Sequence, residues 1–333
     1  MSARYALAAD VPLVVRAQDE LQIGVEEPRR VLLRNAPDRA SRILAALDGA
    51  EPVGAVLVAH DADPVVWCGL LGELLAAGLL IAVGDPAGAA ARPSRGAGHL
   101  SQERIALSHR HGQLAAGRIL QTRQDAIVVI RGDSPAAALV ATLVATAGVG
   151  HVHHDPTPSG LSSADATGGP RRSWPAGTLH AANPFVRTHR PAGHQSPAMV
   201  VLADDPMPDL VLAATLVQQR VPHLSVQTQA GRALVGPLVL PGRSSCLGCV
   251  HRHRADADPG WPAVARQLSR QSPRAPVTIW AIAACFAAAQ VLELLDGASS
   301  PATVNGTVEW TPDGLSARRR TWPEHPDCGC RAC

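Results

Sequence analysis

The segment that most constrains the fold is IVVIRGDSPAAALVATLVATAGVGHVHHD, at residues 127–155. Its first four residues are a continuous apolar run, which is typical of a strand buried on both faces. The alanine-rich stretch after Pro135 indicates a helix, and a second strand-like run ends at Asp155. A strand, a helix and a strand in this order predict a parallel sheet with a crossover helix. The sequence therefore predicts an α/β protein with a Rossmann-like domain.

The turn between that first strand and the helix departs from a phosphate-binding turn. Such a turn is rich in glycine, because bare backbone lets a phosphate approach the helix N-terminus. Gly132 is retained, but the neighbouring positions are occupied by Arg131, Asp133, Ser134 and Pro135. The Asp133 carboxylate would repel a polyphosphate by about 1 to 4 kcal/mol at roughly 4 Å, and Pro135 has no backbone N–H to donate. The sequence therefore argues against bound ATP and Mg²⁺.

A chain of 333 residues is long enough for two domains. Three short strands at 13–16, 21–25 and 30–33, three helices beginning near residues 38, 52 and 64, and a closing strand at 79–83 predict a winged-helix-like module over residues 1–83. A stretch rich in Gly, Ala and Pro at 84–99 has the composition of a linker. Residues 100–333 then form the second domain, with a mostly parallel sheet.

Cysteines cluster at two places in the second domain. CLGC supplies Cys246 and Cys249, and the terminal HPDCGCRAC supplies Cys328 and Cys330, with Cys333 as an alternative to one of these two. Two such pairs can converge on one tetrahedral Zn²⁺ through their thiolates. A redox-active CxxC is the competing interpretation, but it would not need the second cluster. Two other cysteines, Cys68 and Cys285, lie in apolar helical patterns and are expected in the core.

Several classes of partner are disfavoured by charge and pattern. The formal net charge is only +2, which gives no general argument for a nucleic-acid or membrane surface. The N-terminal MSARYALAAD lacks the features of a signal peptide. The apolar stretch 277–295 is interrupted by Gln290 and Glu293, so a buried helix is expected rather than a membrane span. We therefore expect a cytoplasmic protein whose cysteines are thiols or metal ligands.

The second domain resembles a known superfamily in several motifs. These are the helical ERIALSHRHGQ, the strand running into a Gly-containing turn, GVG, CLGC, TIWAIAACFAAAQVLELLDG and HPDCGC. Together they resemble the ThiF/MoeB superfamily of ubiquitin-activating-type adenylyltransferases over residues 101 to the end. A closer similarity is to the actinobacterial branch of ThiF-like partner proteins of azoline-forming cyclodehydratases, known as TOMM proteins. In that branch a precursor-recognition element precedes the ThiF-like domain, and residues 11–83 resemble this element.

The resemblance implies roles for particular residues of the nucleotide site. Gly132 would lie at the phosphate turn, Asp155 would bind the ribose and Asp204 would be a metal-binding carboxylate. The superfamily also uses a lysine near the phosphates, and this chain contains no lysine. Between Cys249 and Cys285 there is no cysteine that could serve as a thioester nucleophile. The site is therefore expected to be vestigial and to have no catalytic residue.

The resemblance also implies a peptide site in the N-terminal module. A leader peptide would add as a strand beside the third strand and pack on the third helix. The residues expected there are Arg30, Leu32, Arg34, Trp67, Leu70 and Leu74. For the three residues of the helix, the alternative is a place in the module's own core. The helix carries one charge, Glu73, and no Arg, so it is poorly suited to reading DNA.

Three functions follow, in order of preference. The first is a non-catalytic ThiF-like scaffold, expected as a homodimer, that binds a ribosomal precursor peptide for a YcaO-type cyclodehydratase. The second is an active ATP-dependent adenylyltransferase that activates the C-terminus of a peptide or carrier protein. The third is a winged-helix regulator.

Overall fold

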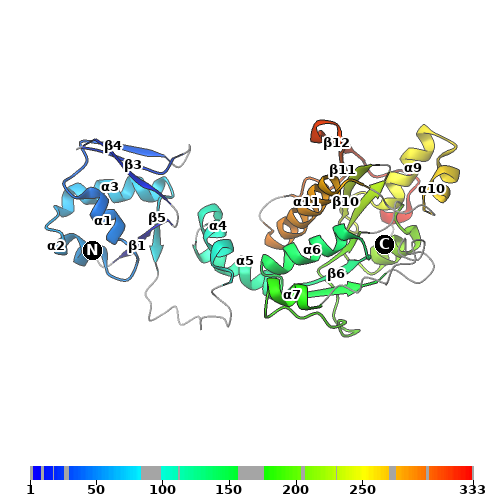
Figure 1. The fold of residues 1–333 in the computed structure, drawn as a ribbon, viewed down its shortest axis with the longest axis horizontal. Helices are drawn as coiled ribbons and strands as arrows, with labels where there is room; N and C mark the ends of the chain where they lie inside the picture. Colours follow the sequence, from blue (N-terminus) through cyan, green and yellow to red (C-terminus); the bar gives the residue numbers. More distant parts are fainter. Residues whose placement is uncertain are drawn as a thin grey trace. The chain divides into compact units, whose positions relative to one another are not determined.

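The chain divides into two compact units, Met1–Ile119 and Leu120–Cys333, in a computed structural model (Figure 1). The structure describes residues 3–8, 11–17, 19–25, 30–83, 99–111, 113–156, 176–203, 207–229, 231–269, 275–297 and 300–331. Most of the linker predicted at 84–99 lies outside these ranges. Each unit is described by itself.

Unit 1 contains the three strands and three helices that the sequence predicts. Strands β2 (Leu13–Ala17), β3 (Glu20–Ile23) and β4 (Val31–Arg34) form an antiparallel sheet in that order. The helices are α1 (Ala40–Ala46), α2 (Val53–Ala59) and α3 (Pro64–Ala76). An unpredicted strand, β1 (Arg4–Leu7), pairs antiparallel with β5 (Leu80–Val83). With this additional pair present, the winged-helix assignment stays a prediction.

The core of unit 1 is formed where the three helices pack on β3. Ile23, Leu44, Leu57, Trp67 and Leu74 are among its fully buried side chains. Each such side chain contributes roughly 1.5–3 kcal/mol of burial free energy, so the unit has a hydrophobic core of its own. Helix α3 begins sharply because the Asp63 carboxylate accepts a hydrogen bond from the Val65 N–H, and Pro64 occupies the first turn.

Helices α4 (Ser101–His111) and α5 (Gln113–Asp125) replace the single helix predicted at 102–120. Residue 112, between them, is not among the described residues. The division between the two units falls within α5.

Unit 2 is built on a seven-stranded sheet in the order β12-β11-β10-β9-β8-β6-β7. Strands β7 (His151–Asp155), β6 (Ile127–Arg131), β8 (Met199–Leu202) and β9 (His223–Gln229) run parallel to one another. Strands β10 (Arg232–Val239), β11 (Gly306–Trp310) and β12 (Ala317–Thr321) continue the sheet with antiparallel pairings. The α/β prediction is confirmed, and the sheet is more mixed than predicted.

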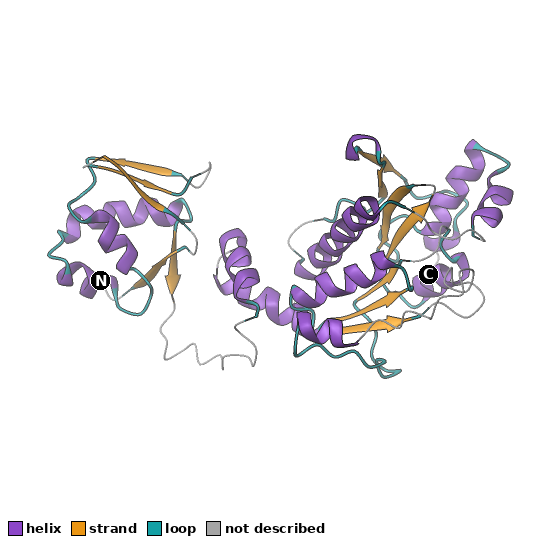
Figure 2. Cartoon of the chain, in the orientation of Figure 1, coloured by secondary structure: helices purple, strands orange, loops and turns teal. Residues whose placement is uncertain are grey.

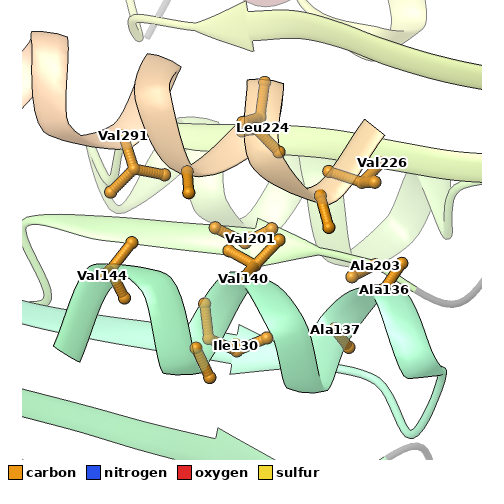
Figure 3. Close-up of a cluster of buried hydrophobic side chains, with 14 of the residues drawn as sticks. Ile130, Ala136, Ala137, Val140, Val144, Val201, Ala203, Leu224, Val226 and Val291 are labelled. Atoms are coloured by element: carbon orange, nitrogen blue, oxygen red, sulfur yellow. The ribbon is translucent and has the colours of Figure 1, made fainter. Parts of the chain in front are cut away.

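Helices cover the sheet of unit 2 on both faces (Figure 2). On one face, α6 (Pro135–Thr146) packs beside α11 (Val277–Asp296), with valines of α6 against Ile130, Val201 and Leu224 of the sheet (Figure 3). The buried faces of both helices are rich in alanine, which lets their backbones approach closely. On the other face lie α8 (Leu210–Gln218) and α9 (Leu247–Ala257), packed against Val200, Leu202 and Val239. The short helices α7 (Ala176–Ala182) and α10 (Trp261–Leu268) complete the unit.

Among the described residues, α11 is the one helix long and apolar enough to cross a membrane. Its Ile279, Ala283, Ala287 and Val291 are instead fully buried in the core of unit 2. The prediction of a core helix is confirmed.

Some expectations about unit 2 and the cysteines are wrong. The strand predicted at 185–188 is reduced to a single bridge between Arg187 and His151. Cys68 and Cys285 are exposed, not in the core, because the buried faces of α3 and α11 are formed by other positions. Helices α9 and α10 were not predicted.

Candidate functional site

Four of the predicted metal ligands come together at one end of α9. Strand β10 ends at Val239, and the Ser244 hydroxyl accepts a hydrogen bond from the Leu240 N–H at 2.8 Å, which closes the turn before the helix. Cys246 stands at the N-cap of α9 and Cys249 in its first turn. Cys328 and Cys330 reach the same place from the C-terminal segment. Cys333 lies outside the described residues.

The sulfur atoms have the spacing that a tetrahedral metal site requires. The Sγ atoms of Cys246 and Cys249 are 3.8 Å apart, and each lies 3.5 Å from one sulfur of the C-terminal pair, Cys328 and Cys330 respectively. A tetrahedron with metal–sulfur bonds of about 2.3 Å has edges of about 3.8 Å. Four converging thiols with this geometry could hold a metal ion, and an all-cysteine donor set suits Zn²⁺.

Protonation within the cluster favours a thiolate at Cys249. A hydrogen bond from the Cys246 thiol lowers the pKa of Cys249 to about 4. The same bond, together with burial, raises the pKa of Cys246. Burial also raises the pKa of Cys330 to about 12. The thiolate is the metal-binding form of cysteine, so Cys249 is already in the form that binds a cation. Binding of a metal ion would release the protons of the other three thiols.

A second group of possible ligands, His253, Asp256 and His325, lies beside the cysteines. Three of its four imidazole nitrogens take part in hydrogen bonds. His325 Nε2 donates to Asp256 Oδ2 at 2.8 Å, and its Nδ1 accepts from the Asp327 N–H at 3.1 Å. His253 Nε2 lies 2.9 Å from the Pro323 carbonyl oxygen. These contacts fasten the segment before Cys328 to α9, which places the second cysteine pair over the first.

The altered turn, residues 131–135, lies at the carboxyl end of β6, where the strand order reverses: β7 lies on one side of β6 and β8 on the other. In sheets of this type, ligands bind at the carboxyl ends of strands at such a switch point. Ser134 caps α6 by accepting from the Ala137 N–H at 3.1 Å, and its hydroxyl donates to the Ala203 carbonyl at 2.8 Å. The turn is thereby tied to the end of β8. The predicted residue Asp204 lies just beyond, outside the described residues.

The polar side chains around this turn contact one another. Arg131 Nη1 lies 3.0 Å from Asp155 Oδ2, and His154 Nε2 lies 3.0 Å from Asp133 Oδ1. The Gly132 N–H also donates to the Asp155 carbonyl at 3.1 Å. Parallel pairing of β6 with β7 places Arg131 directly opposite Asp155. Both carboxylates near the turn therefore have partners from within the chain.

Gly150, the last glycine of GVG, is required for close packing. Its N–H donates to the Arg123 carbonyl at 3.0 Å, and a Cβ at this position would overlap the backbone of Gln124. The motif thus sets the approach of α5 to β7.

The residues predicted for peptide binding fall into two groups. Arg30 and Arg34 are exposed and Leu32 is half-buried, all at or beside β4, which is an edge strand of the described sheet. On α3, Leu70 is half-buried, but Trp67 and Leu74 are 1% and 0% exposed and belong to the core of unit 1. A docked peptide could contact the first group and Leu70 without rearrangement of the core.

Strand β2 has an exposed apolar edge that was not predicted. Val14 and Val15 are 42% and 63% exposed on this strand, which is the other edge of the same sheet. The signal was present, because two adjacent valines in a strand place one apolar side chain on each face.

Comparisons with known proteins identify the fold. No protein-family model and no curated protein sequence matches the chain. Solved structures do match: E. coli MccB with AMPCPP and MccA has a TM-score of 0.66 at 15% identity, covering 99% of both chains. E. coli MccB with ATP gives 0.66 at 16% identity, covering 98% of this chain and 99% of that one. A heterocyclase in complex with substrate and cofactor gives 0.57 at 15% identity, covering 99% of this chain and 40% of that chain. The chain therefore has the fold of MccB over nearly its whole length.

Proposed function

We propose that the protein is a non-adenylating ThiF-like scaffold that binds a ribosomally made precursor peptide through unit 1 and presents it to a partner cyclodehydratase. One observation carries the proposal: the side chains at the altered turn already have partners within the chain, because Arg131 forms an ion pair with Asp155 and His154 Nε2 lies 3.0 Å from Asp133 Oδ1. A nucleotide would have to break these pairs and would then meet the charge of Asp133. The proposed peptide site is instead the β4 edge of the three-stranded sheet in unit 1.

The edge strand β4 suits addition of an extended peptide. Strand addition needs backbone N–H and C=O groups along an exposed edge, with neighbouring side chains giving specificity. Among the described strands, β4 pairs only with β3. Arg34 is exposed at its end and Leu32 is half-buried beside it, so an acidic and apolar leader segment would meet both a charge and an apolar contact.

Peptide binding can be tested by calorimetry of the full chain with the precursor peptides encoded beside its gene. We expect one of them to bind, and Arg34→Glu to weaken it about tenfold, because an attractive charge contact becomes repulsive. Arg16→Glu is the matched control, since Arg16 is exposed on the opposite edge strand, β2. Loss of binding in Arg16→Glu with none in Arg34→Glu would place the peptide on β2 and refute the β4 site.

The partner is proposed from the length of one structural neighbour. The chain aligns with 40% of the length of a heterocyclase that was solved in complex with substrate and cofactor. We infer that here the remaining catalytic part is supplied by a separate YcaO-type protein, and that the scaffold is a cytoplasmic homodimer that carries Zn²⁺ at its four cysteines. Co-elution of the two proteins in size-exclusion chromatography is the expected result.

An active adenylyltransferase is the second candidate, favoured by the fold shared with MccB, which was solved with ATP. That function requires the Arg131–Asp155 ion pair and the His154–Asp133 contact at the altered turn to open for ATP. An enzyme that adenylates must bind ATP, so titration with Mg·ATP separates the two candidates.

A further inference from the structure

A narrow hollow lies between the sheet of unit 2 and the helices α9 and α10. Apolar side chains of β10 and α9, such as Leu234 and Val250, form much of its wall. Its polar lining includes Arg254, His251 and Thr307. None of the four cysteines and none of the residues of the altered turn borders it.

The guanidinium of Arg254 rests on two indole rings. Its Cζ lies 4.7 Å from the ring centroid of Trp261 and 5.5 Å from that of Trp322. These contacts hold the planar group in place. They use none of its five N–H donors, and within the described residues no oxygen accepts a hydrogen bond from it. Burial lowers the pKa of Arg254, and the charge of Arg320 lowers it further.

The other polar groups of the hollow are also donors. The Trp261 indole N–H donates to His251 Nδ1 at 3.0 Å. Because Nδ1 accepts this hydrogen bond, the imidazole proton is on Nε2. Thr307 Oγ1 accepts from the Trp322 indole N–H at 2.9 Å, which leaves its hydroxyl proton to be donated. Three side chains thus offer N–H or O–H groups.

The surrounding charges do not supply the missing acceptor. Arg232, Arg320 and Arg252 stand on the elements around the hollow, on β10, β12 and α9. Glu309 of β11 attracts Arg254 electrostatically, but its Oε1 already accepts from Arg232 Nη1 at 3.0 Å. A desolvated cation without a hydrogen-bonded acceptor is unfavourable. An anion that enters the hollow would therefore be stabilised by hydrogen bonds and by charge attraction from the Arg254 guanidinium.

We propose that this hollow binds a peptide carboxylate, held by the Arg254 guanidinium with His251 and Thr307 as further donors. A planar carboxylate matches the two parallel N–H groups of an arginine, and the apolar wall suits the carbon atoms next to it. The carboxylate belongs to an Asp or Glu side chain or to a peptide C-terminus. The site lies in unit 2 and does not require leader binding by unit 1, so the two proposals fail separately.

The test uses the full chain labelled with ¹⁵N at tryptophan, because Trp261 and Trp322 contact the residues of the site through their indole groups. Four probes are titrated: N-acetyl-Gly-Asp-Gly-amide with its Asn counterpart, and N-acetyl-triglycine with its amide. We expect at least one carboxylate probe to shift indole N–H resonances and to bind about tenfold or more tightly than its neutral partner. The pair that discriminates identifies the source of the carboxylate.

Two substitutions on α9 locate the effect. Arg254→Met should abolish the preference for the carboxylate, whereas Arg252→Met, at an exposed position of the same helix, should keep it. Circular dichroism and metal content verify that both variants fold alike. Equal binding of carboxylate and neutral probes, no binding of any probe up to about 10 mM, or a preference that survives in a folded Arg254→Met protein would overturn the proposal.

Discussion

Cys249→Ser is expected to remove about one bound zinc ion per chain and to lower the stability of unit 2 by several kcal/mol. Cys249 is fully buried, and its sulfur lies 3.8 Å from Cys246 and 3.5 Å from Cys330. A structural zinc ion in a small peptide contributes about 10–16 kcal/mol of apparent binding free energy at neutral pH. In unit 2 much of the fold is held by the sheet and its helices, so a fraction of that value should appear as lost stability. Metal analysis and denaturant unfolding measure the two effects.

Two other cysteine variants give this experiment its controls. Cys68→Ser changes an exposed thiol of unit 1 and should leave the metal content unchanged. Cys330→Ser should release the metal, whereas Cys333→Ser should retain it, which decides between the two C-terminal candidates. An unchanged zinc content in Cys249→Ser would show that the four sulfurs are not a metal site.

Arg123→Met is expected to destabilise unit 2 by about 3–5 kcal/mol. Arg123 donates from Nε and Nη2 to the two carboxylate oxygens of Asp296, at 2.7 Å each, and from Nη1 to the Ala147 carbonyl at 2.9 Å. The side chains of the pair are 3% and 10% exposed. The pair ties the end of α5 to the last residue of α11. Removing the arginine leaves a buried carboxylate without its cation, and the free energy of unfolding measured with urea should fall accordingly.

The loss should depend on the unpaired charge. In Arg123→Met/Asp296→Leu both charges are absent, and part of the lost stability should return. Arg243→Met, at an exposed position of unit 2, should change the free energy of unfolding by less than about 0.5 kcal/mol. A double variant as unstable as the sum of the two single variants would contradict the role given to the ion pair.

The part of unit 2 around the altered turn could be predicted because several local signals agree there. An uninterrupted apolar run marks β6, small residues mark the helix that packs on it, and Ser134 with Pro135 marks the helix start. Parallel pairing then requires the ends of β6 and β7 to meet. The pairing of Arg131 with Asp155 follows from that register, and it was not predicted, because the strand pattern alone does not give the register.

Other elements have only weak patterns in the sequence from which they could be predicted. Strand β1 is four residues long with one buried side chain, Ala6, and its partner β5 lies at the far end of the module. Helix α9 reads HRHRADA in its second half, which lacks an apolar stripe, so its helical form depends on packing that a single-sequence pattern does not contain. In α11 nearly all positions are apolar or small, so periodicity could not show that Cys285 faces outward.

The two sites differed in how far sequence could locate them. Cysteine spacing predicted the metal cluster because few other arrangements use two close pairs. The hollow at Arg254 needs Trp322 from a segment distant in sequence and Thr307 from another strand. Contacts of this kind depend on the folded sheet.

The central claim, that the altered turn no longer receives a nucleotide, is tested most directly by calorimetric titration of the full chain with Mg·ATP. The ion pair of Arg131 with Asp155 and the Asp133 carboxylate beside the turn predict no saturable binding up to about 1 mM. One-site binding with a Kd in the micromolar range would contradict the account and favour the adenylyltransferase.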